Sequence, residues 1–170
     1  MSTIDSGAPD ADPQILIVDD EEIVLVALRD TLKQLGHSVC TATSAAEGLA
    51  LVRQRRFAAV FTDHQMPRLT GLEFLARVRE IQPDASRALL TAALNLGTVI
   101  SAINQAEVFR FLVKPWHREE LLEIVSTAIA RHDLLRFEKR ALTDALKRNR
   151  EQQKQLKALA DELAQLKAKR

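Results

Sequence analysis

The chain has 170 residues, of which 46% are hydrophobic and only 4% aromatic, so it can form one domain with a core, or one domain with an appendage. Its 24 Lys and Arg against 23 Asp and Glu leave a net charge of +1, which excludes a strong overall field for nucleic acid or a membrane surface. The single cysteine, Cys40, excludes an internal disulfide and suits a reducing compartment, so we expect a cytoplasmic protein.

Residues 1–13 are small, polar and acidic and contain two prolines, which predicts a disordered leader rather than a signal peptide. No apolar run is long enough to cross a bilayer, so we expect no membrane partner. The remaining chain divides by composition. Residues 1–130 carry 12 Lys and Arg against 17 Asp and Glu, whereas residues 131–170 carry 12 against 6 and contain neither Gly nor Pro. We therefore expect a domain over 14–130 and an extension over 131–170.

Within residues 14–130, short apolar segments of strand length alternate with segments that have helical apolar spacing. Ser44 and Glu47 match a capping box at the start of the second helix, and Gly36 and Pro83 mark two helix ends. The pattern predicts a three-layer α/β fold, a five-stranded parallel doubly wound sheet with helices on both faces. The expected strands are 14–18, 38–42, 57–61, 87–91 and 108–113, and the expected helices are 23–35, 44–55, 71–81 and 96–105.

Four of the predicted strands end on chemically active side chains. The almost wholly apolar run 57–61 is typical of a strand buried on both faces, and Asp63 follows it directly. The carboxyl ends of parallel strands meet at one edge of a sheet, where open α/β folds bind ligands. We therefore expect Asp63 to lie beside the other strand-end groups, which are Asp19 and Asp20, Thr91, and Lys114.

These residue types fit the transfer of a phosphoryl group to a carboxylate. Three clustered carboxylates raise one another's pKa, and a hard cation such as Mg²⁺ relieves that conflict through oxygen ligands. Lys114 supplies a fixed positive charge and Thr91 a hydroxyl donor. Phosphoryl transfer depends mainly on such charge and positioning, and an aspartate can act as the nucleophile.

The residues from about 14 to 130 resemble a CheY-like receiver domain of bacterial two-component response regulators. The resemblance rests on several short motifs that occur in the family's order. They are Val18-Asp19-Asp20-Glu21, then Asp63 with Met66, Pro67 and Gly71, then Thr91-Ala92, and finally Phe111 with Lys114-Pro115.

By this resemblance, Asp63 is the phosphoacceptor, and a sensor histidine kinase or a phosphotransfer protein is the donor. The resemblance implies Mg²⁺ bound by Asp20, Asp63 and the backbone carbonyl of Gln65, with Asp19 acting through water. It also implies a receiver that catalyses only its own phosphorylation and dephosphorylation.

The resemblance assigns Lys114 to the phosphoryl group, and Thr91 and Phe111 to a switch that acts on the face formed by the fourth helix, fifth strand and fifth helix. It further implies a cis peptide bond between Lys114 and Pro115. Simpler interpretations stay open, because Asp19 and Asp20 could cap the following helix and Phe111 could be ordinary core.

From Arg118 onward the sequence predicts one long helix, about 80 Å long at 1.5 Å per residue. A series of positions seven residues apart, most of them leucine, begins with Leu121 and Ala128, although Glu138 and Gln152 interrupt the pattern. This heptad pattern predicts a parallel homodimeric coiled coil, with Asn149 setting the register. The predicted seam consists of Leu135, Leu142, Asn149, Leu156, Leu159, Leu163 and Leu166.

Other functions compete with the switch. An aspartate-nucleophile phosphatase of the haloacid-dehalogenase type requires a second Asp two residues after the first, where this chain has Gln65. A passive dimerising adaptor remains open. So does the receiver portion of a larger regulator with a cyclic-di-GMP phosphodiesterase, kinase or other output domain, or a coiled coil that recruits a downstream protein. The four scattered histidines lack zinc-ligand spacing, and the basic extension lacks a recognition motif for nucleic acid.

Overall fold

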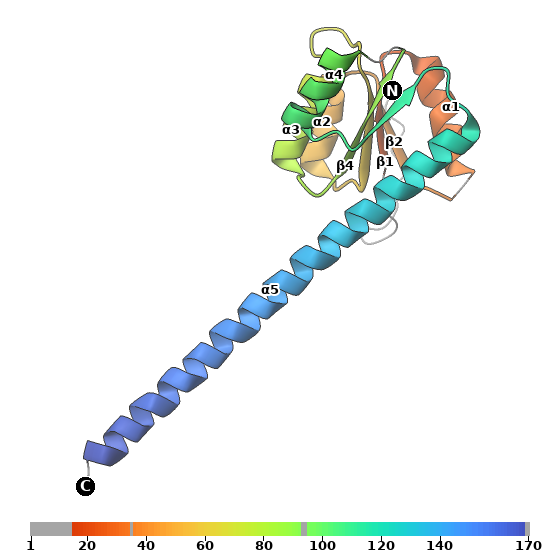
Figure 1. Ribbon diagram of the computed structural model, residues 1–170. Helices are drawn as coiled ribbons and strands as arrows, with labels where there is room; N and C mark the ends of the chain where they lie inside the picture. Colours follow the sequence, from red (N-terminus) through yellow and green to blue (C-terminus); the bar gives the residue numbers. More distant parts are fainter. Residues whose placement is uncertain (1–14, 35, 93–94, 169–170) are drawn as a thin grey trace. The chain divides into compact units, whose positions relative to one another are not determined.

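Five parallel strands form a single sheet in the order β2-β1-β3-β4-β5 (Figure 1). The computed structural model describes residues 15–34, 36–92 and 95–168, so the predicted leader lies outside the described residues. The predicted parallel α/β fold is confirmed. The strands are β1 Ile15–Val18, β2 Val39–Ala42, β3 Ala59–Asp63, β4 Ser86–Thr91 and β5 Arg110–Val113.

Helices cover both faces of this sheet (Figure 1). Apolar residues of α1 and of the first turns of α5 pack with Ile15 and Ile17 on one face, and those of α2, α3 and η1 pack with Leu16 and Val18 on the other. Successive strand residues point to opposite faces, so each strand supplies both halves of the core. The helices are α1 Glu22–Lys33, α2 Ala45–Gln54, α3 Gly71–Ile81, α4 Leu96–Ser101, the π-helix η1 Ala102–Ala106, and α5 Arg118–Ala168.

Two helices begin at side-chain caps that the sequence encodes. The hydroxyl of Thr70 accepts a hydrogen bond from the backbone N–H of Glu73, and the Glu73 carboxylate accepts one in return from the Thr70 N–H. At α2 the Ser44 hydroxyl accepts from the Glu47 N–H, but the Glu47 carboxylate binds the N–H of Thr43 instead. Each cap satisfies N–H groups that the first helical turn leaves without an intrahelical partner.

The region predicted as one regular helix over 96–105 is divided. α4 ends at Ser101, and η1 continues as a π-helix to Ala106. Glu107 then adopts a left-handed conformation with φ 47° and ψ 48°, which is uncommon for a residue other than glycine. The apolar spacing does not distinguish i+4 from i+5 hydrogen bonding, so this departure is visible only in the structure.

The chain separates into two compact units, one ending at Asp133 and one beginning at Leu134. The long predicted helix is present as α5, whose 51 residues span this boundary. Leu121 and Ala128, the first members of the heptad series, are buried against the sheet, so their spacing reflects packing within the first unit. Among the described residues, no helix combines the length and apolar character needed to cross a membrane.

A buried glutamine joins three segments beneath the sheet. The side-chain amide of Gln82 donates to the carbonyl oxygens of Val52 and Arg55, and its oxygen accepts from the N–H of Phe57 at 3.0 Å. The end of α3 is thereby tied to the end of α2 and to the segment that leads into β3.

We predict that Gln82→Leu destabilises the first unit by about 2–4 kcal/mol, because it leaves buried backbone groups without partners at about 1–3 kcal/mol each. Urea denaturation measures this loss. The matched control is Gln54→Leu at an exposed position of α2, which we expect to change the free energy of unfolding by less than about 0.5 kcal/mol. Equal effects of the two substitutions would contradict the prediction.

Candidate functional site

Strand ends bring four predicted site residues to one edge of the sheet. Asp19 directly follows β1, Asp63 is the last residue of β3, Thr91 is the last of β4, and Lys114 directly follows β5. Parallel pairing of β1 with β3, β3 with β4, and β4 with β5 sets these ends side by side. The Lys114 N–H continues the last ladder by donating to the Thr91 carbonyl oxygen at 2.8 Å.

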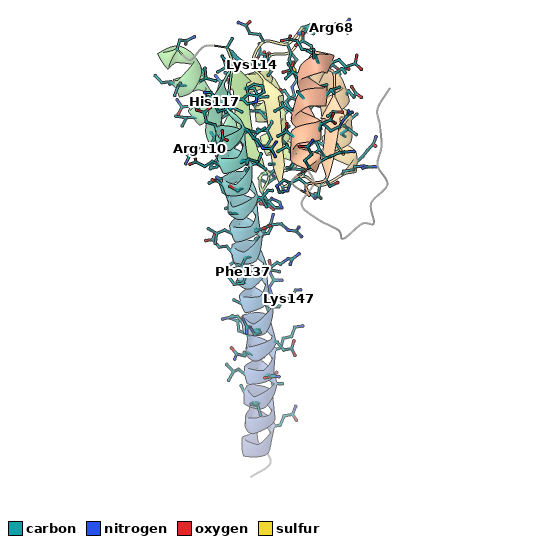
Figure 2. The ribbon with its side chains drawn as sticks, turned by 90° about the vertical axis from the view of Figure 1, so that its right-hand side faces the viewer. Arg68, Arg110, Lys114, His117, Phe137 and Lys147 are labelled. Carbon is teal, nitrogen blue, oxygen red and sulfur yellow. The ribbon has the colours of Figure 1, made fainter. Side chains whose placement is uncertain are left out.

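The ammonium group of Lys114 lies between two carboxylates. Its Nζ is 2.6 Å from Oδ1 of Asp63 and 3.0 Å from Oδ2 of Asp19. Glu21 approaches the same nitrogen at 3.9 Å, although its own side chain is largely exposed. Asp19 and Lys114 are 95 residues apart in sequence, so only the sheet brings them together. In Figure 2, Lys114 and Arg110 mark the two ends of β5.

Backbone contacts hold the Asp63 carboxylate in place. Its Oδ2 accepts a hydrogen bond from the Gln65 N–H at 2.6 Å, while Oδ1 faces Lys114. The next residue, His64, is fixed through its backbone, since its N–H donates to Leu90 and its carbonyl accepts from the Gly71 N–H. Asp63 is almost fully buried, yet both of its oxygens have charged or polar partners.

Gly71 allows the loop after β3 to fold back against the backbone of Asp63. A Cβ atom at this residue would collide with the backbone carbonyl of Asp63 and crowd the backbone of His64. Any side chain here would push the start of α3 away from the end of β3. The glycine therefore sets how closely the capped helix α3 approaches the site.

Burial dominates the electrostatics of Asp19. Desolvation raises the pKa of its carboxyl group above 3.8, even though the Glu21 N–H and Lys114 both favour the charged form. For Lys114, burial alone would lower the pKa, but the hydrogen bonds to Asp63 and Asp19 outweigh it and the pKa is raised. Lys114 therefore stays protonated at neutral pH, whereas burial of the charged Asp19 carboxylate costs solvation free energy.

The oxygen donors at this edge fit a hard divalent cation. Asp19 is buried, Asp20 is exposed beside it, and Asp63 and Gln65 follow on the adjacent strand and loop. Within the described ranges, no three His, Cys, Asp or Glu side chains are gathered into a metal-binding group. Mg²⁺ does not need such a group, because it binds through one or two carboxylates and keeps several waters.

The two predicted switch residues occupy different environments. Thr91 is buried at the end of β4, whereas Phe111 on β5 is half-buried and packs against the core cluster on the α3 and η1 side of the sheet. The strand register sets Phe111 opposite Leu89. The peptide bond between Lys114 and Pro115 is cis, as the family resemblance implies.

In the second unit the described members of the predicted seam are solvent-exposed, apart from the half-buried Leu135 at its start. Leu142, Leu156 and Leu159 have 63%, 67% and 56% of their surfaces exposed. Asn149 is exposed as well, and the side chains of Leu163 and Leu166 lie outside what the structure describes. Phe137, which is not a seam residue, projects from α5 with 70% exposure (Figure 2).

Sequence reasoning missed two residues of the site. Glu21 was available as part of the acidic run after β1, but its distance to Lys114 depends on how α1 begins. Gly71 was part of the motif that contains Asp63, but the need for a missing side chain there comes from the approach of the Asp63 carbonyl.

The sequence profile of the response regulator receiver domain matches residues 15–126. The hydrogenase transcriptional regulatory protein HoxA of Cupriavidus necator is 34% identical over 120 residues, which cover 71% of this chain and 25% of HoxA. The DNA-binding transcriptional regulator NtrC of Azospirillum brasilense is 33% identical over 117 residues, covering 68% of this chain and 24% of NtrC. The chain thus spans about a quarter of the length of these relatives.

A solved structure shows the same fold. The signal receiver domain of an HD domain-containing protein from Pseudomonas fluorescens Pf-5 superposes with a TM-score of 0.70 at 32% sequence identity. The superposition covers 72% of this chain and 98% of that domain, so the similarity is confined to the sheet and its covering helices.

We predict that Asp19→Asn changes the pH dependence of stability. Because the folded-state pKa of Asp19 lies above 3.8, the folded protein binds more protons there than the unfolded chain, and stability falls as pH rises through that window. The asparagine variant lacks this loss. The urea midpoint of the variant should therefore rise relative to that of the wild type as the pH is raised from about 4 to about 7. A midpoint difference, taken as variant minus wild type, that stays constant or falls as pH rises would contradict the raised pKa of Asp19.

Proposed function

The chain belongs to the response regulator receiver domain family, and from that membership we propose that it is a phosphorylation switch with Asp63 as the phosphoacceptor. Receiver domains are signalling modules, and the two curated relatives described above are transcriptional regulators. The proposed donor is a sensor histidine kinase or a phosphotransfer protein. The proposed catalysis is limited to phosphorylation and dephosphorylation of the domain itself.

The observation that carries this proposal is the 2.6 Å separation between Lys114 Nζ and Asp63 Oδ1 at the carboxyl edge of the sheet. A nucleophilic carboxylate needs a nearby positive charge that can also pair with the oxygens of the incoming phosphoryl group. Lys114 meets this need because Asp19 and Asp63 both hold its ammonium group and raise its pKa. Such preorganised charge lowers the barrier without reorganisation during the reaction.

The transfer step uses the groups already in contact. An oxygen of Asp63 bonds to phosphorus as the nitrogen–phosphorus bond of the phosphohistidine breaks, and the electron pair of that bond returns to the imidazole. Lys114 keeps its contact with Asp19 while it pairs with the transferred phosphoryl group. The hydroxyl of Thr91, at the end of the neighbouring strand, then donates to a phosphoryl oxygen.

We propose that Mg²⁺ is the cofactor, held by Asp20, Asp63 and the backbone carbonyl of Gln65, with Asp19 acting through a bound water. When bound, the ion would neutralise charge on the phosphoryl oxygens. The exposed position of Asp20 beside the buried Asp19 supports this division between a direct and an indirect ligand.

Signalling is proposed to pass from Thr91 and Phe111 to the surface made by α4, β5 and α5. Phe111 packs against the same cluster as Ala102 and Ala106 of η1, so a change in its packing can reach that segment. This surface carries exposed apolar side chains at Ile100 and Val113, and the adjoining η1 exposes Ile103, which suits recognition of a protein partner.

The second unit is proposed to pair with its counterpart in another copy of the chain. A helix that exposes Leu142, Leu156 and Leu159 at heptad spacing gains stability by burying them against an identical seam. Asn149 would then meet its symmetry mate and fix a parallel register. This dimeric coiled coil is the proposed route from the receiver to a downstream protein.

One alternative has specific support. The relatives are about four times as long as the matched region, which favours a chain that acts as the receiver portion of a larger regulator. The output in that case is a cyclic-di-GMP phosphodiesterase, kinase or other domain. A phosphorylation-independent dimerising adaptor is the remaining alternative, and the two experiments below separate it from the switch. The single cysteine supports a cytoplasmic location.

We predict that beryllofluoride, an acyl-phosphate mimic, binds the wild type in the presence of Mg²⁺ and that Asp63→Asn abolishes this binding. The amide cannot form the beryllium–oxygen bond and pairs poorly with Lys114. Fluorine NMR of the bound mimic is the measurement. Asp30→Asn, at an exposed position of α1, is the matched control and should bind normally. Retention of the bound signal in Asp63→Asn would rule out Asp63 as the acceptor.

We also predict that the double substitution Leu156→Glu and Leu159→Glu weakens self-association by at least about 100-fold, since each buried leucine contributes roughly 1.5–3 kcal/mol. Light scattering across a concentration series, with and without beryllofluoride and Mg²⁺, measures the effect. Ala158→Glu adds one such negative charge off the seam and should leave association unchanged. A wild type that stays monomeric at all concentrations would refute the coiled coil, and association that ignores beryllofluoride would favour the passive adaptor.

A further inference from the structure

The second unit carries a row of basic side chains along one side of α5. From Arg136 onward, the residues reached by alternate steps of four and three are all lysine or arginine, apart from Thr143. We call the basic members of this row the basic ridge. They are Arg136, Arg140, Lys147, Arg150, Lys154 and Lys157. At 1.5 Å per residue, the ridge extends along the helix for about 32 Å.

The alternate steps keep the ridge on one side of the helix. Seven residues make nearly two turns, so Arg136, Arg150 and Lys157 follow one another with a drift of only about 20° per heptad. When Leu142 and Leu156 take a positions of the predicted seam, the ridge takes the b and f positions, which face away from the seam. A dimer that buries the seam therefore leaves the ridge in solvent.

The side chains of the ridge are exposed and are not neutralised by neighbouring acids. Every position of the row is exposed, and Lys147 projects from α5 (Figure 2). Among the described residues, none of the ridge side chains forms an ion pair with a carboxylate. The hydroxyl of Thr143 donates to the carbonyl oxygen of Lys139 at 2.8 Å, so this interruption of the row is satisfied within the helix.

The ridge lies in a segment with a strong excess of positive charge. Residues 136–157 carry 8 Lys and Arg against 3 Asp and Glu, a balance of +5, whereas residues 1–130 have an excess of acids. Like charges three or four residues apart destabilise a helix. A negatively charged partner would relieve this repulsion along the whole ridge.

The acids beside the ridge indicate which kind of negative partner fits. Asp144 and Glu151 take c positions, so they lie along one flank of the ridge. A membrane surface or a phosphate backbone would bring negative charge against both of them, and like charges at an interface oppose binding. Membrane binding also needs apolar side chains beside the basic ones, whereas the leucines of α5 lie on the opposite side. A protein surface of mixed charge avoids both conflicts.

The spacing of the ridge matches that of another α-helix. Its positions are 3.5 residues apart on average, which is about 5.3 Å along the helix axis. A helix with Asp or Glu at alternate steps of three and four presents carboxylates at the same interval. A single exposed ion pair contributes little, but a regular series of them forms a network that also fixes the orientation of the partner.

We propose that the basic ridge is a docking surface for an acidic α-helix of a partner protein, whose carboxylates follow one another by steps of three and four residues. The docking surface rests on the proposed function, in which the coiled coil leads from the receiver to a downstream protein. It assigns the chemistry of that protein and the side of α5 on which it binds. The seam serves self-association, and the ridge serves the partner.

Designed peptides test the docking surface on the full chain. The probe is a fluorescein-labelled, alanine-based helical peptide of about 24 residues, long enough to span the ridge, with Glu at alternate steps of three and four. The matched peptide has the same composition, with its glutamates distributed around the helix. Fluorescence anisotropy at low salt should show at least about tenfold tighter binding of the spaced peptide. Raising the salt to about 0.5 M should remove most of the difference.

Substitutions in α5 separate the ridge from the overall charge. Arg140→Gln with Lys147→Gln should weaken binding of the spaced peptide by about tenfold, because two charges are lost from the middle of the ridge. Lys139→Gln with Arg148→Gln removes the same charge beside the ridge and should change binding by less than about twofold. Thr143→Arg completes the row and should tighten binding, whereas Thr143→Glu should weaken it.

Equal binding of the two peptides, or equal losses in the two double variants, would overturn the docking surface. Tighter binding of a duplex DNA of about 24 base pairs, or of phosphatidylglycerol vesicles, than of the spaced peptide would overturn the acidic helix as the occupant. Light scattering on the same samples keeps the two proposals apart. A chain that self-associates without preferring the spaced peptide refutes the ridge alone, whereas a monomeric chain that prefers this peptide supports the ridge and refutes the coiled coil.

Discussion

The contact of the Lys114 ammonium group with two buried carboxylates is the interaction on which the arrangement of the site depends. Burial raises the pKa of the Asp19 carboxyl group and the neighbouring Asp63 carboxylate adds to that rise, so a nearby cation is needed to keep Asp19 charged at this depth. Lys114 satisfies both, and it reaches them only because β5 pairs with β4 at the edge of the sheet. The strand order of the sheet therefore also sets the charge balance of the site.

The surrounding structure holds this charged edge rigid at a cost in stability. Desolvation of Asp19 is unfavourable, and the apolar layers on both faces of the sheet must offset it. The capped start of α3 and the side-chain-free Gly71 bring the loop after β3 against Asp63, so that a backbone N–H orients one carboxylate oxygen. Buried acids that weaken the fold are common where a protein needs reactive charge.

The helices of the first unit differ in regularity and in burial. The strands and the capped helices α2 and α3 have continuous buried faces, whereas α4 and η1 combine exposed isoleucines, a π-turn and a left-handed Glu107. In the second unit, Leu142, Leu156 and Leu159 are exposed on a helix that gains little stability from its own sequence without packing against another surface.

The sequence by itself determined the parallel sheet, the convergence of Asp19, Asp63, Thr91 and Lys114 at one edge, and the length of α5. These follow from local periodicity and from the rule that parallel strands end on the same side. Only the tertiary structure decided that Glu21 approaches Lys114, that Gly71 must lack a side chain, that η1 is wound as a π-helix around the partners of Arg87, and that Leu121 and Ala128 belong to the core rather than to a seam. Each of these depends on how segments distant in sequence pack against one another, and apolar spacing along a single segment carries no information about its neighbours.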